Sequence, residues 1–212
     1  MTETVKRKTY DSSSRAGSSR ARRHRILQAA GTEFVERGYL GTTMSGIAER
    51  AEVSLDTVYT LVGRKPELFR LLVETAISGE DEAVVADQRA YVQALLEEGT
   101  AEGKLAIYAQ AVRRIQARLA PLLAVLQQAA GADEELARLW REIGERRAIN
   151  MRRLAEDVVA VRPLRMPVEQ AADIIWATAS TELYLLLVNQ RGWSPGAYER
   201  WLADTWHHTL LA

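Results

Sequence analysis

The stretch TTMSGIAERAEVSLDTVYTLV, residues 42–62, contains two short apolar patterns separated by Glu52-Val53-Ser54. The first pattern has helical spacing through Met44 and Ile47, and either Thr42 or Thr43 can cap its first turn. Ser54 can cap a second helix over residues 55–61, in which Val58 and Leu61 point inward. The positions left largely outside are Leu55, Asp56, Thr57, Tyr59 and Thr60. Because a seven-residue helix is too short to be stable alone, packing against neighbouring helices must hold it.

The flanking sequence supplies two such neighbours. Apolar residues at helical spacing begin at Ile26 and end at Gly38, a residue suited to the C-terminus of a helix. Another helix begins near Lys65, with Pro66 in its first turn. Two short helices joined by a tight turn and braced by a longer one form a helix-turn-helix, although a plain helical hairpin has the same spacing.

A helix-turn-helix explains why so polar a short helix is exposed. Its outer face can enter the major groove, where Thr57 and Thr60 can touch base edges or methyl groups and Tyr59 can reach a phosphate. Lys65 lies at a helix N-terminus, where its ammonium group and the backbone N–H groups can hold a phosphate together.

Composition limits the remaining possibilities. The 212 residues are 47% apolar and include no cysteine, which excludes disulfides and thiolate metal sites and suits the reducing cytoplasm. No stretch has the roughly 18 consecutive apolar residues of a membrane helix, so we expect no membrane partner. Beyond Arg22 the spacing is helical almost throughout, which predicts an all-α fold.

Charge is distributed unevenly along the chain. Residues 1–25 carry eight basic and two acidic side chains, a net charge of +6 against −6 for the remainder. Residues 1–20 are rich in serine and poor in large apolar groups, which predicts a disordered basic arm. Such an arm is either a solvated terminus or an extra DNA contact. In the second case Arg20, Arg22, Arg23 and Arg25 would contact phosphates or a minor groove.

The sequence ILQAAGTEFVERGYLGTTMSGIAERAEVSLDTVYTLVGRKPELF resembles the DNA-binding domain of the tetracycline-repressor (TetR) family of bacterial transcription regulators. The matching features are the Ala-Ala pair before Phe34, G-Y-x-x-T-T, I-A-x-x-A-x-V-S, T-V-Y and K-x-E-L. The resemblance implies DNA-facing positions for Thr43, Ser54, Thr57, Tyr59 and Lys65. Leu55 and Asp56 depart from the usual polar or basic residue and glycine, so the operator sequence does not carry over.

The resemblance further implies an N-terminal helix-turn-helix domain, residues 21–70, and a larger helical effector-binding and dimerisation domain, residues 71–212. The implied function is a repressor that binds a palindromic operator in double-stranded DNA as a dimer and is released by a small-molecule effector. The alternative is a DNA-binding structural or partner-controlled protein without an effector.

Residue patterns predict where the larger domain would dimerise. After breaks at positions that include Pro121, Pro163 and Gly192, helices are expected near 90–98, 101–118, 120–130, 134–161, 168–191 and 195–211. Helix 168–191 is apolar on two sides, and helix 195–211 adds Trp201 and Trp206. These two helices can therefore form a homodimeric four-helix interface, unless other helices of a monomer cover them.

An effector site is predicted near the middle of helix 134–161, where Arg147 interrupts an apolar stripe. Arg147 can face an acidic or carbonyl group of an apolar to amphipathic effector, or it can pair with Glu182 or Asp173. The expected walls are Tyr108, Trp140, Ile143, Trp176 and Tyr184, aromatics that can equally be core. We expect no cofactor, metal site or enzymatic activity, because the sequence has no Glu-x-x-His pair and no phosphate-binding glycine loop.

Overall fold

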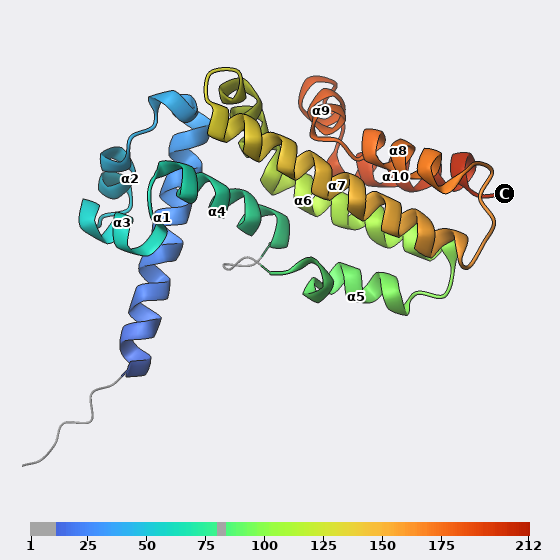
Figure 1. Cartoon of the computed structure of the whole chain (residues 1–212), viewed down its shortest axis with the longest axis horizontal. Helices are drawn as coiled ribbons and strands as arrows, with labels where there is room; N and C mark the ends of the chain where they lie inside the picture. The colour runs from blue at the N-terminus through green and yellow to red at the C-terminus, as the bar shows by residue number, and fades with distance from the viewer. Residues whose placement is uncertain (1–11, 80–83) are drawn as a thin grey trace, which may run out of the picture.

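The structure is a computed structural model that describes residues 12–79 and 84–212. Four helices gather at one end of the molecule, as Figure 1 shows: α1 (Ser12–Gly41), α2 (Met44–Arg50), α3 (Leu55–Val62) and α4 (Lys65–Ser78). The long helices α6 (Ala101–Ala130) and α7 (Glu134–Val159) run from this end through the rest of the molecule. Around them lie η1 (Ala86–Gln88), α5 (Ala90–Glu97), α8 (Val168–Thr178), α9 (Thr181–Tyr184), the π-helical η2 (Leu185–Gln190) and α10 (Pro195–Leu210). The described ranges contain no strand element, so the all-α prediction is confirmed.

Local capping fixes the helix-turn-helix as its sequence predicts. Thr43 Oγ1 accepts a hydrogen bond from the Gly46 N–H at 3.0 Å, and Ser54 Oγ accepts one from the Thr57 N–H at 3.2 Å. Gly38 has a φ of 70°, a left-handed conformation that ends the regular part of α1. In α3 the buried residues are Val58 and Val62.

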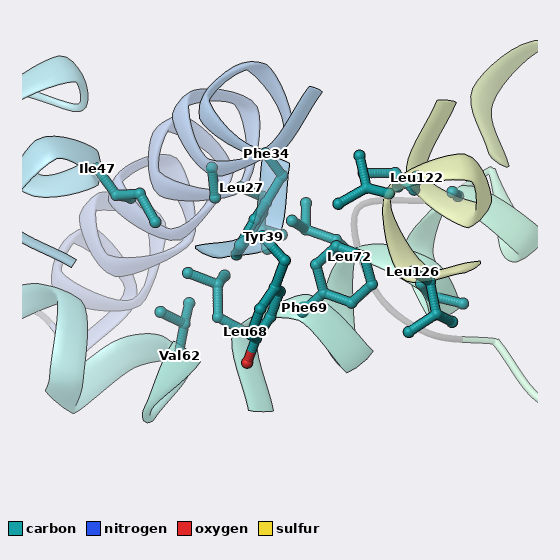
Figure 2. Packing of buried hydrophobic residues seen from close by; sticks show 14 of the residues in the cluster. Leu27, Phe34, Tyr39, Ile47, Val62, Leu68, Phe69, Leu72, Leu122 and Leu126 are labelled. Carbon is teal, nitrogen blue, oxygen red and sulfur yellow. The ribbon is translucent and has the colours of Figure 1, made fainter. Parts of the chain in front are cut away.

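A first hydrophobic core joins the helix-turn-helix to α6 and α7. Its centre is an aromatic cluster in which Phe34 and Phe69 meet edge to face, with 4.8 Å between ring centroids, and Tyr39 packs beside both. Figure 2 shows Leu122 and Leu126 of α6 reaching the same cluster. The first core therefore extends well beyond residue 70, the predicted end of the DNA-binding domain.

A second hydrophobic core lies between the other halves of α6 and α7 and the helices α5, α8 and α10. Trp206, Tyr198 and Leu105 are buried in its interior. Both long helices thus take part in two cores, one shared with α1–α4 and one shared with the C-terminal helices. A rigid-body displacement of α6 or α7 therefore changes the packing of both cores.

The predicted basic arm is helical from Ser12 onward, where α1 begins. The helix continues without interruption into the buried segment that starts at Ile26. Residues 1–11 of the arm lie outside the described residues. Arg22 donates a hydrogen bond to Ser18 Oγ at 2.7 Å, one turn earlier. Once packing at Ile26 has formed the costly first turn, each added residue extends the helix with little further penalty, so residues 12–20 need no core of their own.

The predicted break at Pro121 is wrong, because α6 continues through it without interruption. A proline removes one N–H and costs about 3 kcal/mol inside a helix. The carbonyl that loses its partner belongs to the exposed Ala117, where water can satisfy it. Leu119 and Ala120 before the proline and Leu122 and Leu123 after it are all buried, and this packing offsets the penalty.

The predicted continuous helix 168–191 is also wrong, because the chain breaks between α8 and α9. Ser180 caps α9 by accepting a hydrogen bond from the Leu183 N–H at 3.2 Å. The carbonyls freed by the break find partners elsewhere: Tyr198 Oη donates to the Thr178 carbonyl at 3.0 Å, and Gln116 Nε2 donates to the Ala179 carbonyl at 2.9 Å. Tertiary hydrogen bonds therefore stabilise a break that the apolar pattern hides.

No single helix in the described part of the chain is both long and apolar enough to cross a membrane. The pair Val168–Thr178 and Thr181–Gln190, bent by 44°, meets the criteria of length and composition only when its two helices are taken together.

Candidate DNA-binding surface and ligand cavity

The outer face of α3 carries the side chains predicted to meet DNA. Tyr59 is 45% exposed and Leu55 37% exposed, while Asp56 and Thr60 are also exposed and Thr57 is half-buried. Val58 and Val62 anchor the opposite face in the first core. The helix therefore presents a small polar surface on a rigid support.

Two of the predicted residues already have a structural task. Ser54 Oγ shares a hydrogen bond of 2.7 Å with Thr57 Oγ1, in addition to capping α3. Thr43 caps α2 and remains exposed. A hydroxyl oxygen that caps a helix still has a hydrogen to donate, so Thr43 can donate it to a phosphate.

Lys65, the first residue of α4, lies at the corner between the DNA-binding helices and the start of α7. Its ammonium nitrogen is 4.4 Å from the centroid of the Tyr39 ring, a cation–π contact. Burial lowers the pKa of Lys65, and the negative charge of Asp133, the residue that caps α7, opposes this shift. Burial, followed by the charges of Asp133 and Glu135, raises the pKa of Tyr39 to about 12. Lys65 is thus held in a fixed place while half-exposed.

Arg22 projects from α1 as an exposed side chain, beyond the part of the helix that the first core holds. Arg50, by contrast, is tied to acidic residues: it pairs with Glu33 at 2.8 Å and Glu36 at 2.7 Å. These pairs fasten α2 to α1 and neutralise one of the few cations of the helix-turn-helix.

A cavity of about 780 Å³ lies between the two cores. Leu119, Leu123 and Ile143 contribute to its wall from the first core, and Tyr108, Val112 and Met151 from the second. Glu74 and Ile77 of α4 line it as well. Its volume is typical of sites that enclose a drug-sized molecule.

Three of the six predicted ligand-site residues line this cavity, namely Tyr108, Ile143 and Arg147. Trp140 does not, since it packs against the first core. Tyr184 is buried in the second core, where its ring meets that of Tyr198 edge to face at 5.2 Å. Trp176 is 39% exposed, and its ring lies against the guanidinium group of Arg147. These three aromatics were misplaced because helical spacing does not reveal which of two apolar faces borders a cavity.

Arg147 is held by a backbone carbonyl and an aromatic ring. It donates a hydrogen bond to the Trp176 carbonyl, and the centre of its guanidinium group lies 4.5 Å from the Trp176 ring centroid. Within residues 12–79 and 84–212 it forms no ion pair, neither with Glu182 nor with Asp173, and its buried Nε has no hydrogen-bond partner. Burial lowers the pKa of Arg147, and the charges of Tyr108 and Glu182 oppose this effect.

Sequence reasoning missed the part of the cavity wall that comes from α5 and from the break between α8 and α9. Leu95 and Leu96 line the cavity from α5, and Gln116 and Thr181 from α6 and α9. Thr181 Oγ1 donates to Gln116 Oε1 at 3.0 Å. The available signal was Gln116 itself, an amide in an otherwise apolar stripe that also contains Val112 and Leu119.

Comparison with known proteins agrees with this geometry. Residues 26–72 match the model of the family "Bacterial regulatory proteins, tetR family", while no curated protein matches the chain. NalD, the secondary repressor of the MexAB-OprM multidrug efflux pump in Pseudomonas aeruginosa, is 21% identical with a TM-score of 0.67; the match covers 92% of this chain and 98% of NalD. FadR from Bacillus subtilis, solved in complex with stearoyl-CoA, is 19% identical with a TM-score of 0.64 over 86% of this chain and 96% of FadR. At such identities these two structures establish the fold.

Proposed function

Because the chain belongs to the TetR family of bacterial regulatory proteins and is a DNA-binding transcriptional regulator, we propose that it is a repressor released from a palindromic operator by a small molecule. The observation that carries this proposal is the cavity between the two cores. Its wall includes residues of α4 and of the core that supports α3. A ligand there contacts the C-terminal half of α4, the helix that follows the helix-turn-helix.

The DNA-contacting set that we propose comprises the outer face of α3 and its flanks. Thr57 and Thr60 contact base edges, with Leu55 and Asp56 beside them, while Tyr59, Lys65, Thr43 and Ser54 contact the phosphate backbone. Asp56 is repelled by phosphates, so it favours a cytosine N4 amino group or stays at its helix N-terminus. Arg22 of the extended α1 adds a contact to a phosphate or a minor groove.

Selection from random double-stranded DNA tests this part of the proposal. We expect palindromic sites with half-sites about 34 to 36 Å apart or a multiple of that distance. Tyr59→Ala and Lys65→Ala should weaken binding to all sites similarly, whereas Thr57→Ala and Thr60→Val should change which bases are preferred. Thr32→Val, at an exposed threonine of α1 outside the proposed contact set, is the matched control and should change neither. If only non-palindromic sequences were enriched, binding of DNA by a symmetric dimer would be contradicted.

We propose the C-terminal helices, residues 168–191 and 195–211, as the dimer interface. Tyr198, Leu202 and Trp206 bury one face of α10 in the second core. Trp201 remains half-exposed, and Leu186 of η2 is 45% exposed. Apolar side chains left on the outside of two adjacent helices support an interface that follows a two-fold axis. Leu186→Glu should convert the dimer to a monomer in sedimentation equilibrium and abolish palindrome binding.

An effector can release DNA only if it binds one arrangement of α4 better than the other. Glu74 pairs with Arg146 at 2.6 Å and Arg70 pairs with Glu142 at 2.8 Å, so α4 is fastened to the α7 helix that borders the cavity. Moving a population from nearly all bound to nearly all released needs about 5.5 kcal/mol of differential binding. A largely apolar cavity is suited to supply it for an apolar to amphipathic effector.

The alternative function, a partner-controlled DNA-binding protein without an effector, makes a different prediction. A thermal-shift screen of small molecules should then find none that raises the melting temperature, whereas a ligand that binds only the folded state must raise it. Hits that also displace operator DNA would support the effector proposal. Hits that bind without affecting DNA would contradict it.

A further inference from the structure

The cavity wall contains a half-buried cation that pairs with no carboxylate in the described part of the chain. The Nε atom of Arg147 is buried without a partner, while the other side of the guanidinium group is fixed by the Trp176 carbonyl and ring. An unpaired charge becomes more costly as it loses contact with water, so a counter-charge at this half-buried group is favourable. The guanidinium group is therefore pre-oriented with hydrogen-bonding capacity unused.

Tyr108 lies in the same wall and also has unused hydrogen-bonding capacity. Its side chain is 8% exposed, and its ring stacks on Trp206 with 5.7 Å between centroids. Its hydroxyl makes no hydrogen bond to any residue within 12–79 or 84–212. Burial raises the pKa of Tyr108, and the charge of Arg147 opposes this only in part. The hydroxyl therefore stays protonated and can donate a hydrogen bond.

The other charges of the cavity wall do not compensate Arg147. Glu74 is paired with Arg146 at 2.6 Å, and Glu156 is paired with Arg152 at 3.1 Å. The remaining acids of the wall, Asp87 and Asp157, are matched in number by Arg89 and Arg153. Arg147 therefore has no paired carboxylate among the described residues of the wall.

We propose, on the basis of the function inferred above, that the effector is a small amphipathic monoanion whose carboxylate lies between Arg147 and the Tyr108 hydroxyl. Its apolar part lies against Ile115, Leu119 and Leu123, whose side chains offer no partner for a second charged group. A carboxylate both neutralises the guanidinium group and accepts hydrogen bonds from the two side chains. A neutral carbonyl group supplies only the acceptor, and a cationic ligand is repelled.

The position of this site also explains how a bound ligand can affect the DNA-binding helices. The carboxylate would engage α6 through Tyr108 and α7 through Arg147, on the second-core side of the cavity. Its apolar part would touch Leu119 and Leu123, which belong to the core that supports α3. One ligand therefore bridges the two cores, which is what a differential effect on the DNA-binding helices requires.

Three probes that differ only at the head group test the inference: decanoate, decan-1-ol and decylamine, measured by isothermal titration calorimetry at neutral pH. We expect the full chain to bind decanoate at least tenfold more tightly than decan-1-ol, and decylamine most weakly. Arg147→Met should abolish the preference for decanoate over the alcohol. Tyr108→Phe, which removes only a hydroxyl, should weaken decanoate binding several-fold and leave decan-1-ol unchanged, so it remains informative if Arg147→Met does not fold.

Arg141→Met is the matched control, because it removes an exposed arginine of the same helix that does not line the cavity, and it should keep the preference. The inference is overturned if decylamine binds as tightly as decanoate, if none of the probes binds, or if Arg147→Met and Tyr108→Phe both keep the wild-type preference. Each of these results leaves operator binding intact, whereas failure to select a palindromic operator overturns the proposed function itself.

Discussion

Leu126→Ala tests whether the DNA-binding helices depend on α6 for their core. Leu126 lies far outside the helix-turn-helix in sequence, yet it is 0% exposed and packs in the first core with Phe34 and Phe69. The substitution removes three carbon atoms from a fully buried site, a transfer loss of about 2.4 kcal/mol at roughly 0.8 kcal/mol per carbon. A residual cavity in the first core adds about 1 to 2 kcal/mol, giving about 3.4 to 4.4 kcal/mol.

Native-state hydrogen exchange locates this loss. We expect Leu126→Ala to lower the free energy of opening of the buried amides of α1 and α4 by about 3 kcal/mol, a large share of the 5 to 15 kcal/mol typical of a domain. Leu105→Ala is the matched control, because Leu105 is 1% exposed on the same helix but in the second core. It should act first on the amides of α8 and α10.

Dependence of the DNA-binding helices on α6 is refuted if Leu126→Ala leaves exchange in α1 and α4 unchanged. That result would mean that residues up to 70 form a self-sufficient core. Operator affinity gives a second readout, since loosening the support of α3 should weaken DNA binding in Leu126→Ala more than in Leu105→Ala.

Deleting residues 1–24 should lower operator affinity and flatten the slope of log K against log salt concentration, because residues 26–70 alone carry a net charge of −1; an unchanged slope would make the arm a spectator. Ser180→Ala should cost about 1 kcal/mol in urea denaturation through loss of the α9 cap, whereas Ser45→Ala, at an exposed serine within α2, should cost less. The pKa of Glu67 is lowered by hydrogen bonds from the Arg64 backbone and side chain, and that of Glu142 by a hydrogen bond from the Arg70 side chain. Since these carboxylates bind protons less readily when folded, the urea midpoint should be highest near neutral pH and fall as the pH drops below about 4; a midpoint independent of acid would contradict this.

The sequence by itself determined the helix-turn-helix. Its boundaries depend on contacts between residues three or four positions apart, such as Thr43 with Gly46 and Ser54 with Thr57, and on the left-handed Gly38. Such signals are complete within one turn of chain, so reading them needs no knowledge of the rest of the molecule. The same locality explains the start of α10, where Ser194 caps the helix and Pro195 is its first residue.

Tertiary structure decided everything that depends on which of several apolar faces meets which neighbour. Packing on both sides of Pro121 keeps α6 continuous, and the Tyr198 and Gln116 hydrogen bonds hold the break before α9. Likewise, Trp140 and Tyr184 belong to cores, whereas Arg147 and Tyr108 border the cavity. Periodicity records that a residue is apolar and on a helix face. It does not record the partner of that face, because the partner comes from residues distant in the chain.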